Sequence, residues 1–294
     1  MVESNNLNQT IELKDGRSLG FAEFGDLNGM PLFHFHGHPG SRLEGKFFKE
    51  IPEKLGFHAV CVDRPGIGLS DFKPNRMLLD WPIDILELAD YLGFDKFIVE
   101  GISGGGPYAL VCAYSIPERI HCCGVIAGLG PMTMAKDGMM RSNRISVFLA
   151  RWTPFILKIM YKYEMRALND PEKARKLMIK LSEKLPEPDK LILQDPNLLE
   201  IFLEDTKEAF RSGLDGVMQD EKIYSRSWGF NLEEISPEVQ VYLWQGDLDV
   251  NVPVSMGHQM SKLIPTCEGF FFPNEAHLSV AFNHLKEILE TLRS

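Results

Sequence analysis

Residues 96–105 read Lys-Phe-Ile-Val-Glu-Gly-Ile-Ser-Gly-Gly, and this stretch decides the fold assignment. Lys96–Val99 is short, apolar and followed by glycine, as expected of a strand that is buried on both faces. Gly104–Ser115 has a helical pattern, so Ser103 stands in a tight turn between a strand and a helix. A glycine-rich turn with no catalytic role could have the same sequence. Ser103 therefore becomes informative only if the rest of the chain supplies partners for it.

Strand-like and helix-like segments alternate on both sides of this turn. Apolar or alternating runs predict strands at Thr10–Leu13, Leu19–Phe24, Pro31–Phe35, His58–Val62, Ile120–Ala127, Val239–Trp244 and Gly269–Phe272. Helical spacing of apolar residues predicts helices at Arg42–Leu55, Trp81–Leu92 and Leu278–Leu292. Because alternating strands and helices are joined by right-handed crossovers, the sequence predicts an α/β fold. Its central sheet is mostly parallel and covered by helices on both faces.

Short local signals predict two element boundaries. Asp15-Gly16 lies between the first two predicted strands and indicates a hairpin turn. Ser41 is followed three residues later by Glu44, which is the spacing of a capping box. We therefore expect a helix to begin at Arg42.

The pattern changes between Met132 and Trp228, where only helical periodicity is present. The predicted helices there are Ile145–Tyr163, divided at Pro154, then Pro171–Leu185, Leu198–Arg211 and Leu214–Tyr224. A helical block between two parts of one sheet is typical of a lid. We therefore expect a core formed by residues 1–131 and 229–294, with a helical cap inserted at residues 132–228.

The first cap segment is rich in large apolar side chains. They are Phe148, Leu149, Trp152, Phe155, Ile156, Leu157, Ile159 and Met160. Such a helix could touch a lipid surface. We expect instead that these side chains line a pocket and pack on the core. A nearby acidic cluster, Glu204, Asp205 and Glu208, could bind a substrate amine, but we expect it to be a solvated helix face.

Composition excludes several classes of protein. The 294 residues carry 31 Lys and Arg against 41 Asp and Glu, a net charge of −10, and no basic run compensates locally. Nucleic acid is therefore not an expected partner. The hydrophobic fraction of 44% is an ordinary globular value, which argues against disorder. No apolar run reaches the ~18 residues of a membrane span.

Two features predict a cytoplasmic protein. The five cysteines, at positions 61, 112, 122, 123 and 267, show no paired spacing and are expected to be reduced. The polar, acidic start of the chain resembles neither a secretory signal nor a transit peptide.

Partners for Ser103 follow two later strands. Asp247 and Asp249 come after the strand Val239–Trp244, and His277 follows Gly269–Phe272. The carboxyl ends of parallel strands meet at one edge of a sheet, where ligands bind. Since a serine needs an oriented base to become a nucleophile, the order Ser, Asp, His predicts a nucleophilic site at this edge.

Four segments together resemble the α/β-hydrolase fold superfamily, in its capped branch. They are His36-Gly37-His38-Pro39-Gly40, Asp63-Arg64-Pro65-Gly66-Ile67-Gly68-Leu69-Ser70, Gly101-Ile102-Ser103-Gly104-Gly105 and Gly246-x-x-Asp249-x-x-x-Pro253. They resemble, in order, the oxyanion loop, the D-x-x-G-x-G-x-S turn, the nucleophile elbow and the acid loop. The resemblance covers nearly the whole chain and implies the α/β-hydrolase fold with an inserted helical cap.

The resemblance also implies roles for individual residues. Ser103 would attack a substrate carbonyl, His277 would move the proton, and Asp249 would orient the imidazole. Backbone N–H groups of His38 and Gly104 would face the developing oxyanion. His36, Gly37, Gly101 and Gly105 would support these two turns. Asp247 is the alternative acid, and His284 on the last helix is expected to be solvated.

His34, His36 and His38 occupy every second position along a predicted strand and its loop. Side chains at this spacing share one face of a strand, which is an arrangement that could bind a metal. Metal-hydrolase loops of this type also need a carboxylate close to the histidines. In this chain the positions next to His38 hold Gly37 and Pro39, which have no carboxylate. We therefore expect no metal and no other cofactor. His34 should pack beside the strand.

The expected function is that of a cytosolic serine hydrolase acting on a small, mostly apolar ester as its carbonyl substrate. Amidase, aminopeptidase or C–C hydrolase chemistry on the same triad stays open, as does a non-catalytic ligand receptor with this fold. A serine at position 103 argues against haloalkane dehalogenases and epoxide hydrolases, which need a carboxylate nucleophile. Ile102 stands where His or Trp is frequent in the family, which leaves the subfamily and the substrate open.

Overall fold

The computed structural model describes residues 7–47, 50–134 and 136–294. Within these residues, eight strands form one sheet in the order β1-β2-β4-β3-β5-β6-β7-β8. The strands are β1 (Gln9–Glu12), β2 (Ser18–Gly25), β3 (Met30–Phe35), β4 (Phe57–Val62), β5 (Phe97–Ile102), β6 (Ile120–Ile126), β7 (Gln240–Gly246) and β8 (Cys267–Phe272). β2 pairs antiparallel with β1 and β4, and the other pairings are parallel. The predicted hairpin and the mostly parallel sheet are confirmed.

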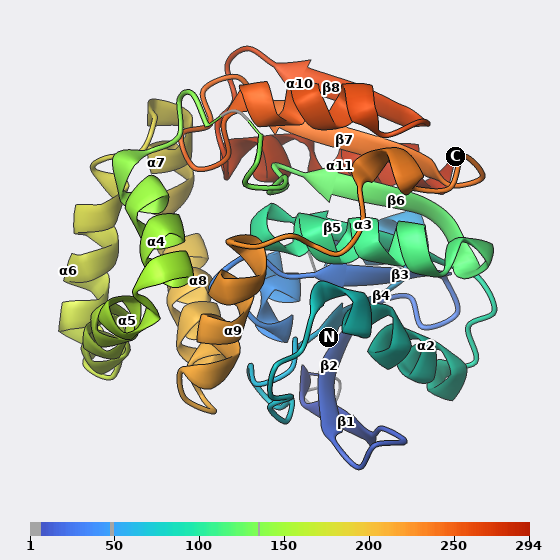
Figure 1. Ribbon diagram of the computed structural model, residues 1–294, viewed down its shortest axis with the longest axis horizontal. Helices are drawn as coiled ribbons and strands as arrows, with labels where there is room; N and C mark the ends of the chain where they lie inside the picture. The colour runs from blue at the N-terminus through green and yellow to red at the C-terminus, as the bar shows by residue number, and fades with distance from the viewer. Residues whose placement is uncertain (1–6, 48–49, 135) are drawn as a thin grey trace.

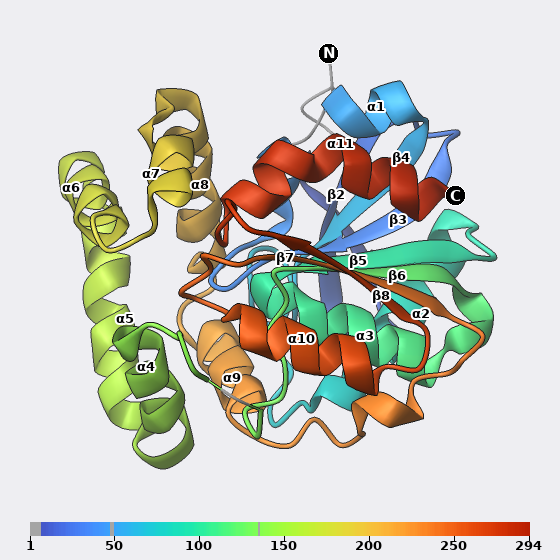
Figure 2. The ribbon, with the colours of Figure 1, turned by 90° about the horizontal axis from the view of Figure 1, so that it is seen from above.

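Helices cover both faces of this sheet (Figures 1 and 2). On one face lie α2 (Trp81–Leu92), α3 (Gly106–Ser115) and α10 (Val254–Leu263), and on the other lie α1 (Glu50–Leu55) and α11 (Ser279–Arg293). Each face has its own apolar core, because the strands alternate side chains between the two layers. Tyr108 and Val111 of α3 belong to one core, and Ile288 of α11 belongs to the other.

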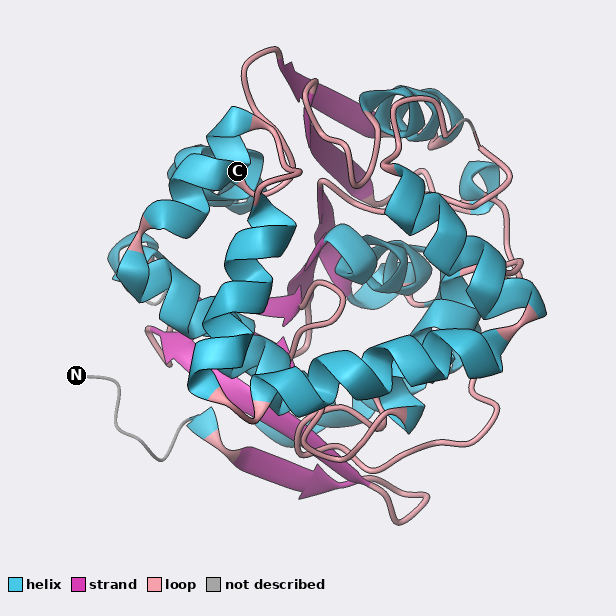
Figure 3. Cartoon of the chain, turned by 90° about the vertical axis from the view of Figure 1, so that its left-hand side faces the viewer, coloured by secondary structure: helices cyan, strands magenta, loops and turns pink. Residues whose placement is uncertain are grey.

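A separate group of helices lies between β6 and β7 in sequence. It consists of α4 (Arg141–Trp152), α5 (Pro154–Leu168), α6 (Pro171–Ser182), α7 (Glu187–Gln194), α8 (Pro196–Ala209) and α9 (Asp215–Tyr224). These helices lie beside one end of the sheet, and Figure 3 views the molecule from this side. The predicted break at Pro154 is confirmed, since α4 ends at Trp152 and α5 begins at Pro154. The division into core and cap stays a prediction.

Several predicted helix boundaries are wrong. The single helix expected over Arg42–Leu55 begins as a 3₁₀ segment, Arg42–Phe47, and α1 covers only Glu50–Leu55; residues 48–49 lie outside the described part of the chain. The expected capping box is absent from the described contacts of Glu44. Its carboxylate instead accepts a hydrogen bond from the Gly37 N–H and contacts the buried ring of His34.

The interpretation of the apolar cap segment is also wrong for most of its residues. Leu157 is buried, and Met160 lines the cavity described below. Phe148, Trp152, Phe155 and Ile159, by contrast, are at least 60% exposed. They lie on the side of α4 and α5 that neither the sheet nor the other helices cover. None of the described helices combines the length and apolar composition of a transmembrane span.

Candidate active site

The turn between β5 and α3 holds Ser103 in a strained conformation. Ser103 begins a short 3₁₀ segment, Ser103–Gly105, and has a φ of 53°, which lies in the left-handed region. A Cβ on Gly105 would overlap the carbonyl oxygen of Phe35, and one on Gly101 would overlap the carbonyl of Gly105. Glycine at these two positions is therefore a steric requirement of the turn. The result is a serine side chain presented at the end of β5.

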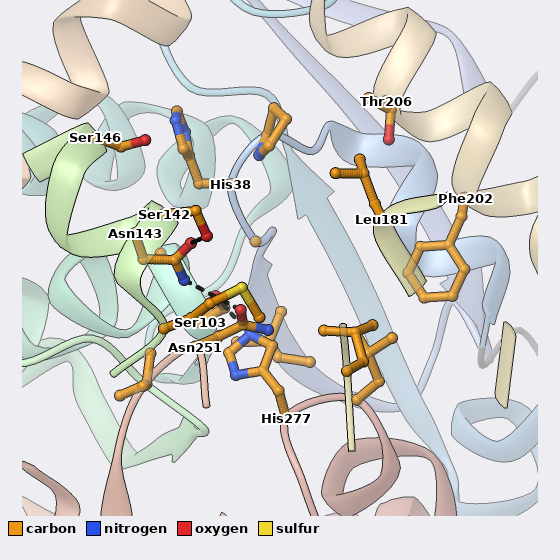
Figure 4. Close-up of a pocket in the computed structure, with 18 of the residues that line it drawn as sticks. His38, Ser103, Ser142, Asn143, Ser146, Leu181, Phe202, Thr206, Asn251 and His277 are labelled. Atoms are coloured by element: carbon orange, nitrogen blue, oxygen red, sulfur yellow. Dashed lines mark hydrogen bonds between the residues drawn. The ribbon is translucent and has the colours of Figure 1, made fainter. Parts of the chain in front are cut away.

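Three predicted residues that are far apart in sequence meet at this sheet edge. Figure 4 shows two of them, Ser103 and His277. The Ser103 hydroxyl lies 2.9 Å from Nε2 of His277. Nδ1 of the same ring lies 2.7 Å from Oδ2 of Asp249. Ser103 follows β5, Asp249 follows β7 and His277 follows β8, and all three strands run parallel. Parallel pairing thus brings the ends of the three strands together.

Asp249 is held in place by its own loop. Oδ1 accepts hydrogen bonds from the backbone N–H groups of Asn251 and Val252, and Oδ2 also accepts one from the side chain of Gln245. The Asp249 side chain is inaccessible to solvent, whereas Asp247 is an exposed residue. The structure therefore brings Asp249, and not Asp247, to His277.

His277 is buried next to this carboxylate. Burial disfavours the imidazolium, but the charge of Asp249 and its hydrogen bond outweigh burial and raise the pKa of His277 above its ordinary 6.5. A base of raised pKa that remains within reach of a hydroxyl suits proton transfer. His284 does not share this environment. Its ring lies against Phe272 and contacts Glu275 and Glu287.

Asp189 of α7 is a partner of the His277 loop that sequence reasoning missed. Its Oδ2 accepts a hydrogen bond from the backbone N–H of His277, and Oδ1 accepts bonds from Leu278 and Ser279. These are the N–H groups at the start of α11, so the carboxylate caps that helix. Asp189 is fully buried, and burial raises its pKa although these bonds oppose the rise. Nothing in the local sequence of α7 marks this contact, which joins residues about ninety positions apart.

The loop after β3 lies against the serine turn. A Cβ on Gly37 would lie 3.7 Å from the Cβ of Ser103, and a Cβ on Gly104 would lie 2.8 Å from that of His38. Arg64 fixes this loop by donating to the carbonyl oxygens of His36 (2.5 Å) and Gly37 (2.9 Å). The turn that contains Arg64 and the loop that contains His38 therefore act as one structural unit.

Helix α9 anchors the same loop from the other side. Asp220 accepts a hydrogen bond from Nε of Arg64, and its carboxylate lies 3.6 Å from Nδ1 of His38. Arg64 and Arg76 lower the pKa of Asp220 far below its ordinary value despite burial. Tyr224 donates to the carbonyl oxygen of Gly104. The sequence predicted α9 as a cap helix but gave no sign of these contacts.

His34 is enclosed by two carboxylates. Nδ1 lies 2.5 Å from Glu100 and Nε2 lies 3.0 Å from Glu44. Burial opposes the charge, but the two carboxylates raise the pKa of His34 to about 10, so the ring is an imidazolium at neutral pH. No group of three or more metal-ligating side chains is present in the described part of the chain. Both ring nitrogens of His34 therefore face carboxylate partners within the core.

A cavity of about 510 Å³ opens above Ser103 and His277. In Figure 4, Ser142, Asn143 and Ser146 of α4 lie on one side of the serine, and Leu181, Phe202 and Thr206 lie on the other. Leu185, Leu278 and Phe282 add to the apolar side of the lining. The cavity is thus formed jointly by the sheet edge and the helices α4 to α9.

The acidic cluster on α8 is not a uniform solvated face, as the sequence suggested. Glu204 pairs with Lys46, and Glu208 pairs with Arg42. Asp205, however, is buried, lines the cavity and accepts hydrogen bonds from the N–H and hydroxyl of Ser41. The prediction for Asp205 is therefore wrong, because α8 turns this side chain toward the loop before Arg42.

Comparison with known proteins gives matches to a family model and to solved structures over most of the chain. A family model described as "alpha/beta hydrolase fold" matches residues 31–283. An esterase from Exiguobacterium antarcticum is similar in structure, with a TM-score of 0.69 and 17% identity over 98% of this chain and 100% of that one.

Sequence relatives match only in part. A proline iminopeptidase of Neisseria gonorrhoeae is 26% identical over 117 residues, which are 37% of this chain and 36% of the relative. Epoxide hydrolase 1 of Caenorhabditis elegans is 31% identical over 123 residues, which are 39% of this chain and 30% of the relative. The chain thus matches about a third of the length of these curated relatives.

Proposed function

Because this chain belongs to the alpha/beta hydrolase fold family, we propose that it is a serine hydrolase that uses Ser103, His277 and Asp249 as a catalytic triad. The observation that carries the proposal is the continuous contact from Asp249 through the His277 ring to the Ser103 hydroxyl. The fold alone would not suffice, since one fold hosts many functions.

Acylation begins at the Ser103 hydroxyl. Its oxygen attacks the substrate carbonyl carbon while Nε2 of His277 takes the proton, and Asp249 stabilises the imidazolium that forms. The tetrahedral oxyanion accepts hydrogen bonds from the backbone N–H groups of His38 and Gly104. Each such donor contributes about 2.7–4 kcal/mol to transition-state stabilisation. The bond to the leaving alcohol then breaks, and the imidazolium gives that alcohol its proton.

Deacylation repeats the cycle with water. His277 takes a proton from a water molecule as its oxygen attacks the acyl carbon, and the Ser103 oxygen leaves with the proton that His277 returns. The products are a carboxylic acid and the free enzyme. No redox partner or metal is needed at any step, because every proton is moved between His277 and the reacting oxygens.

The cavity lining supports a small, largely apolar ester as substrate. Leu181, Leu185, Phe202 and Phe282 offer a surface for an alkyl or aryl group next to the serine. The volume of about 510 Å³ is within the ordinary range of small-molecule sites. Removing such a group from water supplies about 25 cal/mol per Å² of buried apolar area.

Hydrolysis of p-nitrophenyl esters of increasing acyl length tests the proposal. Wild type should release p-nitrophenol, and Ser103→Ala should lower kcat by about 10⁴-fold or more while its circular dichroism and melting temperature stay near those of wild type. Full activity in Ser103→Ala would remove Ser103 from the mechanism. A folded wild type that binds esters without turnover would favour the non-catalytic receptor.

A second candidate is an aminopeptidase with the same triad. Two observations favour it: the partial similarity to proline iminopeptidases and the presence of Glu164 and Asp205 in the cavity wall. A carboxylate in a cavity can pair with the ammonium group of a peptide's first residue. Proline p-nitroanilide, assayed beside the esters, separates the two candidates. A higher kcat/KM for the anilide would establish the aminopeptidase.

A further inference from the structure

Two adjacent cap helices expose a row of large apolar side chains. Ile145, Phe148 and Trp152 follow one another at helical spacing on α4, and Phe155, Ile159 and Tyr163 do so on α5. All six are between 47% and 73% exposed. We call these six residues and the cations described next the α4–α5 outer face. Such a concentration of exposed apolar side chains is unusual for a surface that faces only water.

The same two helices concentrate positive charge in an acidic protein. Residues 141–168 hold six basic residues and one acidic residue, a net charge of +5, whereas the whole chain carries −10. The six are Arg141, Arg144, Arg151, Lys158, Lys162 and Arg166, and all are exposed.

These cations lie beside the apolar residues. On α5, Lys158, Lys162 and Arg166 form a row at four-residue spacing next to the row that starts at Phe155. On α4, the guanidinium of Arg151 lies 5.4 Å from the ring of Trp152. Among the described residues, no carboxylate lies within ion-pair distance of Arg141, Arg144, Lys162 or Arg166.

We propose that the α4–α5 outer face docks on an anionic lipid surface. Basic side chains interleaved with Trp, Phe and Tyr are the composition of helices that lie in the plane of a membrane interface. The apolar side chains would enter the headgroup region, and the cations would pair with lipid phosphates. This inference concerns binding and goes beyond the proposed hydrolase function.

Charge also argues against a second copy of the chain as the occupant. A two-fold symmetric contact would bring the same surface of both copies together, so their unpaired cations would face one another. An anionic lipid surface instead complements them. Since the Debye length is ~10 Å at 0.1 M salt, the local charge of this face acts there while more distant acidic residues are screened.

The inner sides of the same helices line the cavity. Ser142, Asn143 and Ser146 of α4 and Leu157 and Met160 of α5 contribute to its wall. In Figures 1 and 2, both helices belong to the group of helices that lies beyond one end of the sheet. Docking through their outer sides would therefore hold the substrate cavity close to a lipid surface in which apolar esters dissolve.

Vesicle flotation of the 294-residue chain tests the proposal. The vesicles contain either phosphatidylcholine alone or equal parts of phosphatidylcholine and phosphatidylglycerol. Wild type should bind the anionic vesicles at least tenfold more strongly than the neutral ones. The triple variant Trp152→Ser, Phe155→Ser, Ile159→Ser should lose at least tenfold of this binding. The triple variant Arg144→Gln, Lys162→Gln, Arg166→Gln should lose about a hundredfold, at about fivefold per cation.

A matched control carries Ile83→Ser and Tyr91→Ser on α2, where both side chains are as exposed as those of the outer face. This control should bind like wild type. The Ser103→Ala variant should also bind like wild type, so loss of the hydrolase function and loss of lipid binding are distinguishable. Absence of binding to anionic vesicles, or equal binding by wild type and both triple variants, would overturn the proposal. So would a dimer in light scattering that the apolar variant dissociates.

Discussion

The chemistry proposed for this protein depends on where single side chains are held. A serine hydroxyl is a weak nucleophile unless a base lies beside it. For Ser103 that base is His277, whose Nε2 lies 2.9 Å from the hydroxyl oxygen. His277 in turn depends on Asp249, whose remaining oxygen is fixed by two backbone N–H groups. A change at any of the three should therefore act on kcat far more than on binding.

The two candidate acids give a direct comparison at the residue scale. Asp249→Asn should lower kcat by about 10⁴-fold, because an amide cannot hold the required tautomer of His277 or stabilise its cation. Asp247→Asn is the matched control and should leave kcat within about twofold, since Asp247 is exposed. Steady-state hydrolysis of one p-nitrophenyl ester measures both. A larger loss at 247 would reverse the assignment.

The pH dependence of kcat/KM reports on His277. The base must be neutral to take a proton, and its pKa is raised in the folded protein. Activity should therefore fall as the pH decreases, with a midpoint above 6.5. Asp249→Asn should move the midpoint of the residual activity downward, since it removes the charge that raises the pKa. A midpoint below 6 in wild type would contradict this environment for His277.

The sequence made Ser103, Asp249 and His277 predictable because each follows a recognisable strand. Ser103 and Asp249 also lie in short local motifs. Asp189 and Asp220 were not predictable in this way. Their roles come from contacts with segments about ninety and 156 positions away. Only the tertiary packing of α7 and α9 creates those contacts.

At the scale of elements, α7 is joined to the start of α11 by Asp189. Asp189→Ala should destabilise the fold by about 1–3 kcal/mol, since three N–H groups, two of them buried, lose their acceptor. It should also lower kcat, because His277 is one of those three residues. Urea unfolding and ester hydrolysis on the same preparation measure the two effects.

Asp195→Ala is the matched control for this prediction. Asp195 caps α8 through the N–H groups of Asn197 and Leu198, and it is exposed. Its loss should cost about 0.5–2 kcal/mol of stability with kcat unchanged. Equal kcat values for the two variants would show that Asp189 has no influence on His277.

Element types were more predictable than their limits. Every predicted strand is present, because apolar runs ending in glycine or polar loops are strong local signals. Helix α10 was missed, although Pro253 immediately precedes it. Helix α7 was also missed. It lies between the predicted helices Pro171–Leu185 and Leu198–Arg211, which correspond to α6 and α8, and it begins after Pro186 with Pro188 in its first turn.

At the scale of the whole molecule, buried histidines couple stability to pH. The pKa values of His34, His38 and His277 are raised by nearby carboxylates that outweigh burial. The folded state keeps these protons at a pH where the unfolded chain has lost them. The free energy of unfolding should therefore fall as the pH rises above 6.5, by at most about 1.4 kcal/mol per pH unit for each group.

His36 acts in the opposite direction. Burial and the charge of Arg64 lower its pKa well below 6.5, so its contribution to stability is lost as the pH falls through that region. Urea unfolding at pH 6.5 and at about pH 8 should give the higher free energy at pH 6.5. A higher value at about pH 8 would contradict the protonated state assigned to His34.

The whole molecule also shows why the apolar cap segment was misread. Apolar residues at helical spacing predict a buried face. In the described part of the chain, however, no other helix or strand packs on one side of α4 and α5. Periodicity identifies which residues share a face but not what covers that face. The position of the two helices relative to the sheet decides this, and it depends on the packing of the complete chain.

The most direct test of the central claim is covalent labelling with a fluorophosphonate, followed by mass spectrometry of the peptide that contains Ser103. Such a probe reacts with a serine whose hydroxyl is activated by a base. The triad predicts one adduct per chain, located on Ser103, and its loss in His277→Ala. An unlabelled native protein, or an adduct on a different residue, would contradict the account.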